Sequence, residues 1–160
     1  ASGMTWTILR NGVYAEILGA PLSWEKHGEA LRTLSPLGDG VVAAVARHDL
    51  ACAAASVLSD PDRHERKVYE LVGSRAVSAA DVAVRLGCEV RDISLGDYRK
   101  LLAEGGMPSF RQSLMLSIAS VIRHGFLANT GDDLPYLLGR EPTDPLAVAA
   151  EVMAARAPVS

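Results

Sequence analysis

The order of strand-like and helix-like segments along the chain constrains the fold more than any other feature. A β-branched and aromatic segment opens the chain at residues 5–10, and further strands are expected at 30–34, 41–45, 67–72 and 89–93. Helical patterns lie between several of these strands, and helices alone fill the chain after residue 94. Alternation of this kind is typical of βαβ units and a parallel sheet covered by helices. The sequence therefore predicts an α/β fold with a small, helix-rich lobe beside the sheet.

End signals define the expected helices. Asp49 precedes an apolar segment, and we expect its carboxylate to cap a helix that ends before Asp60. Ser78 is followed three residues later by Asp81, the spacing of a capping box. Glycines and prolines mark most of the other ends. The remaining helices are expected at residues 13–18, 79–86, 94–104, 109–126, 132–138 and from 144 onward.

Composition and charge exclude several classes of partner. The chain has 16 basic and 19 acidic residues without a basic cluster, so we expect no nucleic acid partner. No apolar run reaches the roughly 18 residues that would cross a bilayer, so we expect no membrane partner. Cys52 and Cys88 make no disulfide framework, and no His or Cys pair has metal-ligand spacing. We therefore expect a cytoplasmic protein without a metal.

The first candidate site directly follows the opening strand. Ligands of open parallel sheets bind outside the carboxyl ends of the strands. Asn11 and Gly12 stand at such an end, where they tolerate unusual backbone angles and let a ligand approach the main chain. Tyr14 lies one turn further, and its ring could cover a flat heterocycle. The alternative interpretation is an ordinary strand-to-helix turn with Tyr14 in the core.

The second candidate site is the charged triplet between two apolar segments, which contains Arg47 and Asp49. Arg47 could bind an anion or pair with Asp49. The alternative is that Asp49 is only a helix cap and that Arg47 is solvated. The sequence has neither a glycine-rich phosphate loop nor a G-x-S-x-G elbow, so it assigns no catalytic residue.

Four segments taken together resemble the NmrA-like family of atypical short-chain dehydrogenases, closest to its NAD(P)H:quinone oxidoreductases. They read WTILRNGVYAEIL, GDGVVAAVARHDLACAAASVL, KVYELVG and VSAADVAVRLG, and the resemblance extends over nearly all of residues 4–153. It implies that residues 1–158 are the C-terminal half of an NAD(P)-binding Rossmann-type domain, including its substrate lobe. It also implies that the N-terminal dinucleotide-binding half is absent, since residues 1–3 match the tail of a helix that precedes a late strand in such proteins.

The resemblance also implies a function and site residues. Hydride would pass from NADP(H) or NAD(H), held mainly by the absent half, to a quinone or a similar small electrophile. Asn11, Gly12 and Tyr14 would lie near the nicotinamide end of the cofactor. Arg47 and Asp49 would mainly fix the local structure beside the substrate pocket. Apolar helices between residues 114 and 138 would wall that pocket.

Two alternatives to an enzyme stay open. One is a redox-sensing regulator that binds NAD(P) without turnover, as in regulatory members of the family. The other is a stand-alone domain whose opening strand pairs between two copies, because an exposed apolar edge invites association into a homodimer.

Overall fold

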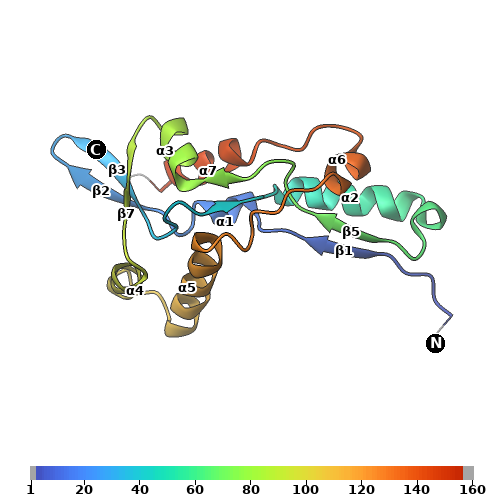
Figure 1. Cartoon of the computed structure of the whole chain (residues 1–160), viewed down its shortest axis with the longest axis horizontal. Coiled ribbons are helices and arrows are strands. Elements are labelled where there is room, and N and C mark those ends of the chain that lie inside the picture. The colour runs from blue at the N-terminus through green and yellow to red at the C-terminus, as the bar shows by residue number, and fades with distance from the viewer. Residues whose placement is uncertain (1–2, 157–160) are drawn as a thin grey trace.

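The computed structural model describes residues 3–156 (Figure 1). The helix tail that we expected at residues 1–3 and the domain end at 158 therefore lie partly or wholly outside the described residues. The strands are β1 (Ile8–Asn11), β2 (Ser23–His27), β3 (Ala30–Ser35), β4 (Val41–Val42), β5 (Val68–Leu71), β6 (Val77–Ser78) and β7 (Glu89–Asp92). The helices are α1 (Ala15–Leu18), α2 (Arg47–Ser59), the short 3₁₀ helix η1 (Pro61–His64), α3 (Ala79–Arg85), α4 (Leu95–Glu104), α5 (Ser109–Arg123), α6 (Asp133–Leu138) and α7 (Pro145–Ala154).

The strands form three small sheets. β1 and β5 pair in parallel, with Asn11 opposite Leu71 at their carboxyl ends. β3 also pairs in parallel with β7, while β2 and β3 form an antiparallel hairpin and β4 pairs antiparallel with β6. The predicted α/β class with parallel pairing is confirmed. The strand β2 was not predicted, because its Ser-Trp-Glu-Lys-His sequence carries a weak strand signal and depends on β3 for its pairing.

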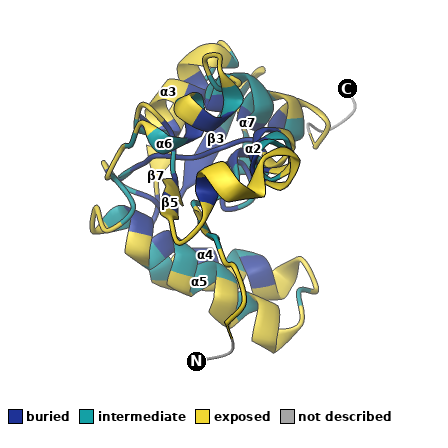
Figure 2. Ribbon diagram, turned by 90° about the vertical axis from the view of Figure 1, so that its right-hand side faces the viewer, coloured by how far each residue is buried: buried dark blue, intermediate teal, exposed yellow. Residues whose placement is uncertain are grey.

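Two hydrophobic cores divide the chain into two lobes (Figures 1 and 2). The first core lies among α1, β3, α3, α4, α5 and α7 and includes fully buried Leu18, Val82 and Met153. The second core lies between the β1–β5 pair and the helices α2 and α6, and includes Leu71 and Leu134. In Figure 1 the second core is on the right, and β1 runs from there toward the middle of the molecule. The carboxyl ends of β1 and β5 therefore meet where the two lobes join.

Several element ends differ from the sequence prediction for one reason: backbone groups find partners distant in the chain. The opening strand begins at Ile8 instead of residue 5, because β5 begins only at Val68, its register partner. The first helix begins at Ala15 instead of residue 13, because Tyr14 forms a parallel bridge with Val45. The capping box at Ser78 is confirmed.

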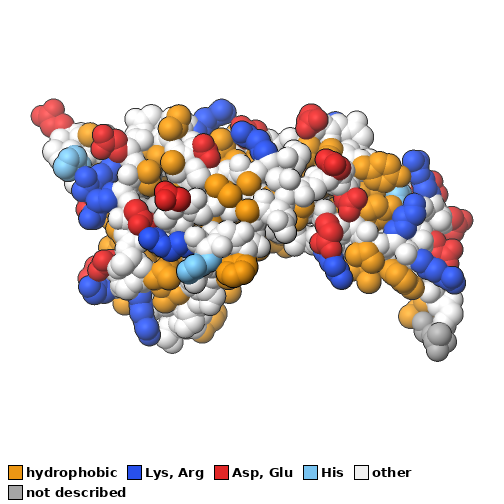
Figure 3. Space-filling model, viewed as in Figure 1, with side chains coloured by type: hydrophobic (Ala, Val, Ile, Leu, Met, Phe, Trp, Pro, Cys, Tyr) orange, Lys and Arg blue, Asp and Glu red, His pale blue; other side chains and the backbone are white. Residues whose placement is uncertain are grey.

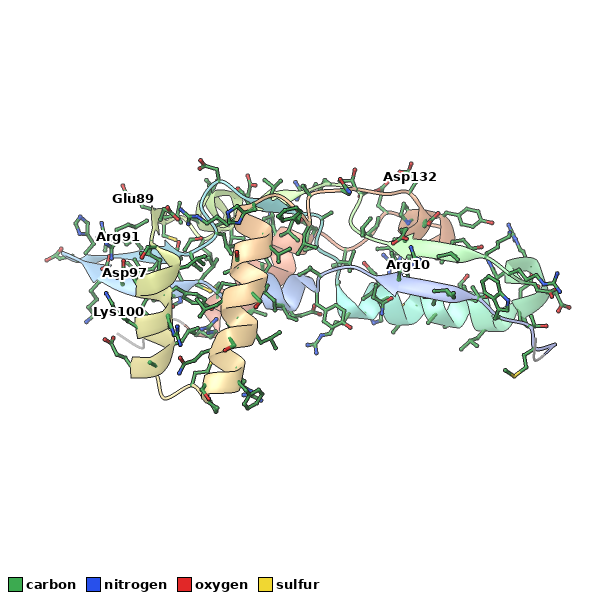
Figure 4. All side chains as sticks on the ribbon, turned by 60° about the horizontal axis from the view of Figure 1, so that its bottom comes forward. Arg10, Glu89, Arg91, Asp97, Lys100 and Asp132 are labelled. Carbon is green, nitrogen blue, oxygen red and sulfur yellow. The ribbon has the colours of Figure 1, made fainter. Side chains whose placement is uncertain are left out.

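One face of the β1–β5 pair is open. Within the described residues β1 pairs only with β5, and α2 packs on the face opposite to Ile8 and Val68. Trp6, Ile8 and Val68 are each more than two-fifths exposed, and hydrophobic side chains gather on this lobe in Figure 3. Arg10, labelled in Figure 4, lies on the same face as Ile8, where its guanidinium is 2.6 Å from the Glu70 carboxylate.

Candidate functional site

The first part of the candidate site is the carboxyl end of β1. Asn11 is the last residue of the strand and is exposed. The N–H of Gly12 donates to the Leu71 carbonyl at 2.9 Å, which holds the two strand ends together. A Cβ at position 12 would lie 3.0 Å from that oxygen and 3.2 Å from Val72 Cγ1, so the approach requires glycine. The structure thus brings Asn11 and Gly12 together at a strand end, as predicted.

Two more glycines line this edge. The N–H of Gly73 donates to the Ala43 carbonyl, and a Cβ on Gly73 would come within 2.7 Å of the Ala44 oxygen. The N–H of Gly131 donates to the Gly73 carbonyl at 3.3 Å. Sequence reasoning did not single out these glycines, although Gly73 directly follows a strand as Gly12 does. Glycine at these positions lets neighbouring segments of the chain approach one another closely beyond the strand ends.

Tyr14 lies beside this edge but belongs to the protein interior. Its ring is half-buried and packs against the second core, close to Val45, with which its backbone forms a bridge. This is the packing that the alternative interpretation of the turn described. A role for Tyr14 in covering a flat ring stays a prediction.

Arg47 opens helix α2 and interacts with α1. Its backbone N–H donates to Glu16 Oε1 at 3.2 Å, and its guanidinium Nε lies 3.5 Å from the same oxygen. The Glu16 carboxylate therefore serves the free N–H groups at the beginning of α2. The pairing of Arg47 with Asp49 that the sequence allowed is not formed. The side chain of Arg47 is mostly exposed.

Asp49 is not the N-cap of α2, and that prediction was wrong. The helix begins two residues earlier, its N-cap is Ala46, and the Asp49 side chain is fully buried. Its carboxylate accepts one bond from the Arg140 guanidinium and one from the Thr143 backbone N–H, both at 2.6 Å. Burial acts to raise the pKa of Asp49, but these two donors outweigh it and hold the pKa below its usual value. Asp49 thus ties the chain after α6 to α2.

That tied segment forms one wall of a small cavity. The cavity of about 170 Å³ lies past the end of β5 and is lined by Ala44, Gly73, Ser74, Arg75 and residues 141–145. Arg75 pairs with Asp144 across the wall at 2.5 Å. Asp49 does not line the cavity, but its bond to Thr143 holds a lining residue. The structure therefore places Asp49 behind the wall of a pocket and Arg47 away from it.

Residues 3–156 contain neither a cluster of metal ligands nor a membrane-spanning helix. No group of three or more His, Cys, Asp or Glu side chains there could hold a metal ion. In the same residues no helix combines the length and the apolar character needed to span a bilayer.

Comparison with known proteins shows which proteins this chain is similar to. The chain is 34% identical over 154 residues to quinone oxidoreductase 2 of Escherichia coli (strain K12), a match that covers 91% of this chain and 52% of that protein. It is 30% identical over 146 residues to an NAD(P)H azoreductase of Xenophilus azovorans, covering 87% of this chain and 50% of that protein. The chain thus spans about half the length of these curated relatives. No protein-family model matches it.

Solved structures agree with the sequence relatives. Citrobacter sp. triphenylmethane reductase, solved in complex with NADP(H), superposes with a TM-score of 0.77 at 28% identity, covering 92% of this chain and 53% of that one. The E. coli NADPH-dependent quinone oxidoreductase, solved with NADPH, gives a TM-score of 0.76 at 30% identity, covering 94% and 54%. These matches confirm the resemblance to NAD(P)H-dependent reductases and the Rossmann-type α/β class.

Proposed function

We propose that this chain is the substrate-side part of an NAD(P)H-dependent oxidoreductase that reduces a quinone or a similar flat, electron-poor molecule. The observation that carries the proposal is the glycine-lined carboxyl edge of a parallel strand pair, in a chain homologous to reductases of quinones and azo compounds. Open parallel sheets bind their ligands at this edge.

The residues at the edge fit the nicotinamide end of a dinucleotide. The cofactor, when bound, supplies a hydride. Gly12 and Gly73 let the chain segments at this edge pack closely, and the exposed amide of Asn11 can both donate and accept hydrogen bonds there. Asp49 keeps the wall formed by residues 141–145 in place, so that the cavity past β5 can hold part of a substrate. Arg47 acts only through Glu16, as a support for the beginning of α2.

The open edge of β1 is where we place the contact with the nucleotide-binding half. The reductases to which this chain is similar are about twice as long, and β1 has one strand partner within the described residues. A parallel strand added beside β1 would satisfy its free backbone groups. This arrangement would bring the cofactor to Asn11 and Gly12 from the far side of β1.

This proposal predicts weak cofactor binding by the 160 residues alone. The pyrophosphate of a dinucleotide normally sits at a helix N-terminus after a glycine-rich loop, and this sequence has no such loop. Titration calorimetry of the 160-residue chain with NADPH should show no binding in the micromolar range. Micromolar binding would contradict the division of labour between the two halves.

The activity itself is tested on the gene product that carries both halves. Purified enzyme should oxidise NADPH, followed at 340 nm, only when a quinone such as menadione is added. Nucleotide binding without turnover on quinones or azo dyes would instead support a redox-sensing regulator.

A further inference from the structure

Phe126 is an exposed aromatic side chain just after the end of α5. Its side chain is 75% exposed, whereas Tyr14 packs against the second core. A single exposed apolar side chain needs no explanation by itself. The position of Phe126 and the conformation of the backbone around it do need an explanation.

The backbone around Phe126 is fixed by the end of α5. Gly125 has a φ of 77°, its N–H donates to the Ile122 carbonyl at 2.9 Å, and the Phe126 N–H donates to the Val121 carbonyl at 3.1 Å. These are the two bonds of a Schellman motif, in which the residue at the position of Phe126 frequently packs back onto the last turn of the helix. Here the ring is left in solvent on a rigid turn.

Hydrogen bonds connect this turn to the candidate site. The carbonyl of Leu127, the next residue, accepts from the Ala43 N–H at 2.9 Å, and the Ala43 carbonyl accepts from the Gly73 N–H at 3.0 Å. Four residues after Leu127, the Gly131 N–H donates to the Gly73 carbonyl, and a Cβ on Gly131 would lie 3.0 Å from Val72 Cγ2. The segment that begins with Phe126 therefore passes beside Gly73, just past the carboxyl end of β5. In Figure 1 the C-terminal end of α5 likewise reaches the middle of the molecule, where β1 ends.

We propose that Phe126 is a substrate-contact residue whose ring stacks on the flat ring of the electrophile and sets the preference for aromatic substrates. The inference rests on the proposed function and adds to it a residue that is not part of the predicted site. Offset stacking of two rings contributes through the quadrupole and the buried area together. A ring already held by a rigid turn loses little entropy when a substrate stacks on it.

The test is binding of menadione to the 160-residue chain, measured by calorimetry without cofactor. Phe126→Ala should weaken binding by about 2- to 12-fold, the effect of one aromatic pair. Phe126→Trp should bind at least as well as the wild type, and Phe126→Leu should lie between Trp and Ala. Because the side chain is exposed, all three variants should keep the wild-type unfolding temperature.

A matched control lies on the same helix. Phe110 is 70% exposed near the beginning of α5, about 20 Å from its end, so Phe110→Ala removes a similar surface ring away from the site. Phe110→Ala should bind menadione as the wild type does. Equal binding by wild type and Phe126→Ala, or no menadione binding at all, would overturn the role of Phe126. NADPH oxidation by the complete enzyme decides the proposed function separately.

Discussion

Asp49→Asn tests the buried polar connection between α2 and the segment after α6. Asparagine keeps the shape of the side chain, so no cavity forms. One of the two carboxylate oxygens is replaced by an amide NH2 group, which donates hydrogen bonds and cannot accept them. The Arg140 guanidinium and the Thr143 N–H both need an acceptor at 2.6 Å, so at least one of them loses its partner. The Asp49 side chain itself is fully buried, which leaves no room for water to replace that acceptor.

The expected loss follows from these contacts. Hydrogen bonds to charged groups contribute about 1.5–3 kcal/mol each. The Arg140 side chain is nearly half exposed and can turn toward water when its partner is lost. The combined energy of the two bonds therefore lies toward the lower end of the range that these values give. We expect Asp49→Asn to lower the free energy of unfolding by about 2–4 kcal/mol, a large part of the stability of a small domain. Urea unfolding followed by circular dichroism at 222 nm measures it as a shift of the midpoint at constant slope.

The same variant should change the pH dependence of stability. Because the pKa of Asp49 is lower in the folded state than its ordinary value of 3.8, the folded state holds this proton less readily than the unfolded state. The stabilising contribution is therefore present above about pH 4 and is lost as the pH falls through the folded pKa. The difference in stability between wild type and Asp49→Asn should shrink over that acid range.

A matched control separates these bonds from loss of charge in general. Asp132, labelled in Figure 4, is an exposed carboxylate just before α6 and makes no side-chain capping bond. Asp132→Asn should change the free energy of unfolding by no more than about 0.5 kcal/mol. A loss below 1 kcal/mol for Asp49→Asn, or equal losses for the two variants, would refute the reasoning.

Three further variants, one of them a control, test packing in the two lobes. Gly12→Ala places a Cβ 3.0 Å from the Leu71 oxygen and should cost about 1–3 kcal/mol in urea unfolding, whereas Gly96→Ala, whose Cβ would meet nothing closer than 3.6 Å, should be neutral or gain up to about 1 kcal/mol. Equal effects of the two changes would contradict the close approach at the strand ends. Tyr98→Phe should raise the free energy of unfolding by about 1 kcal/mol, because the buried hydroxyl has no hydrogen-bond partner among the described residues. Burial raises the pKa of Tyr98 to about 12, so a phenol titrating near 10 in the folded protein would show that the ring is solvated.

Features set by neighbouring residues could be predicted from the sequence. Ser78 and Asp81 form both bonds of the expected capping box, Ser94 accepts from the Asp97 N–H at the beginning of α4, and Gly139 ends α6 with a left-handed φ of 65°. Each signal needs only residues within one turn. Asn11 and Gly12 could be placed at the carboxyl end of a strand because the strand and turn signals around them are equally local.

Features set by distant partners could not be predicted. Asp49 has the sequence of a helix cap, but its true partners lie 91 and 94 residues further along the chain. The position of the segment that follows Phe126 depends on a backbone bond between Leu127 and Ala43, which are 84 residues apart in the chain. Propensity and spacing contain no information on such long-range pairing, and tertiary contacts decide it.

The division into two cores has a practical consequence for spectroscopy. The chain has two tryptophans, one on each side of that division: Trp24 packs against the first core and donates to the Met153 carbonyl at 3.0 Å, while Trp6 is 45% exposed beside the end of α2. Replacing either with phenylalanine leaves one fluorophore that reports on a single lobe. Emission from Trp24 then reports the unfolding of the lobe around the first core. A blue shift in the emission of Trp6 would show that another polypeptide covers β1.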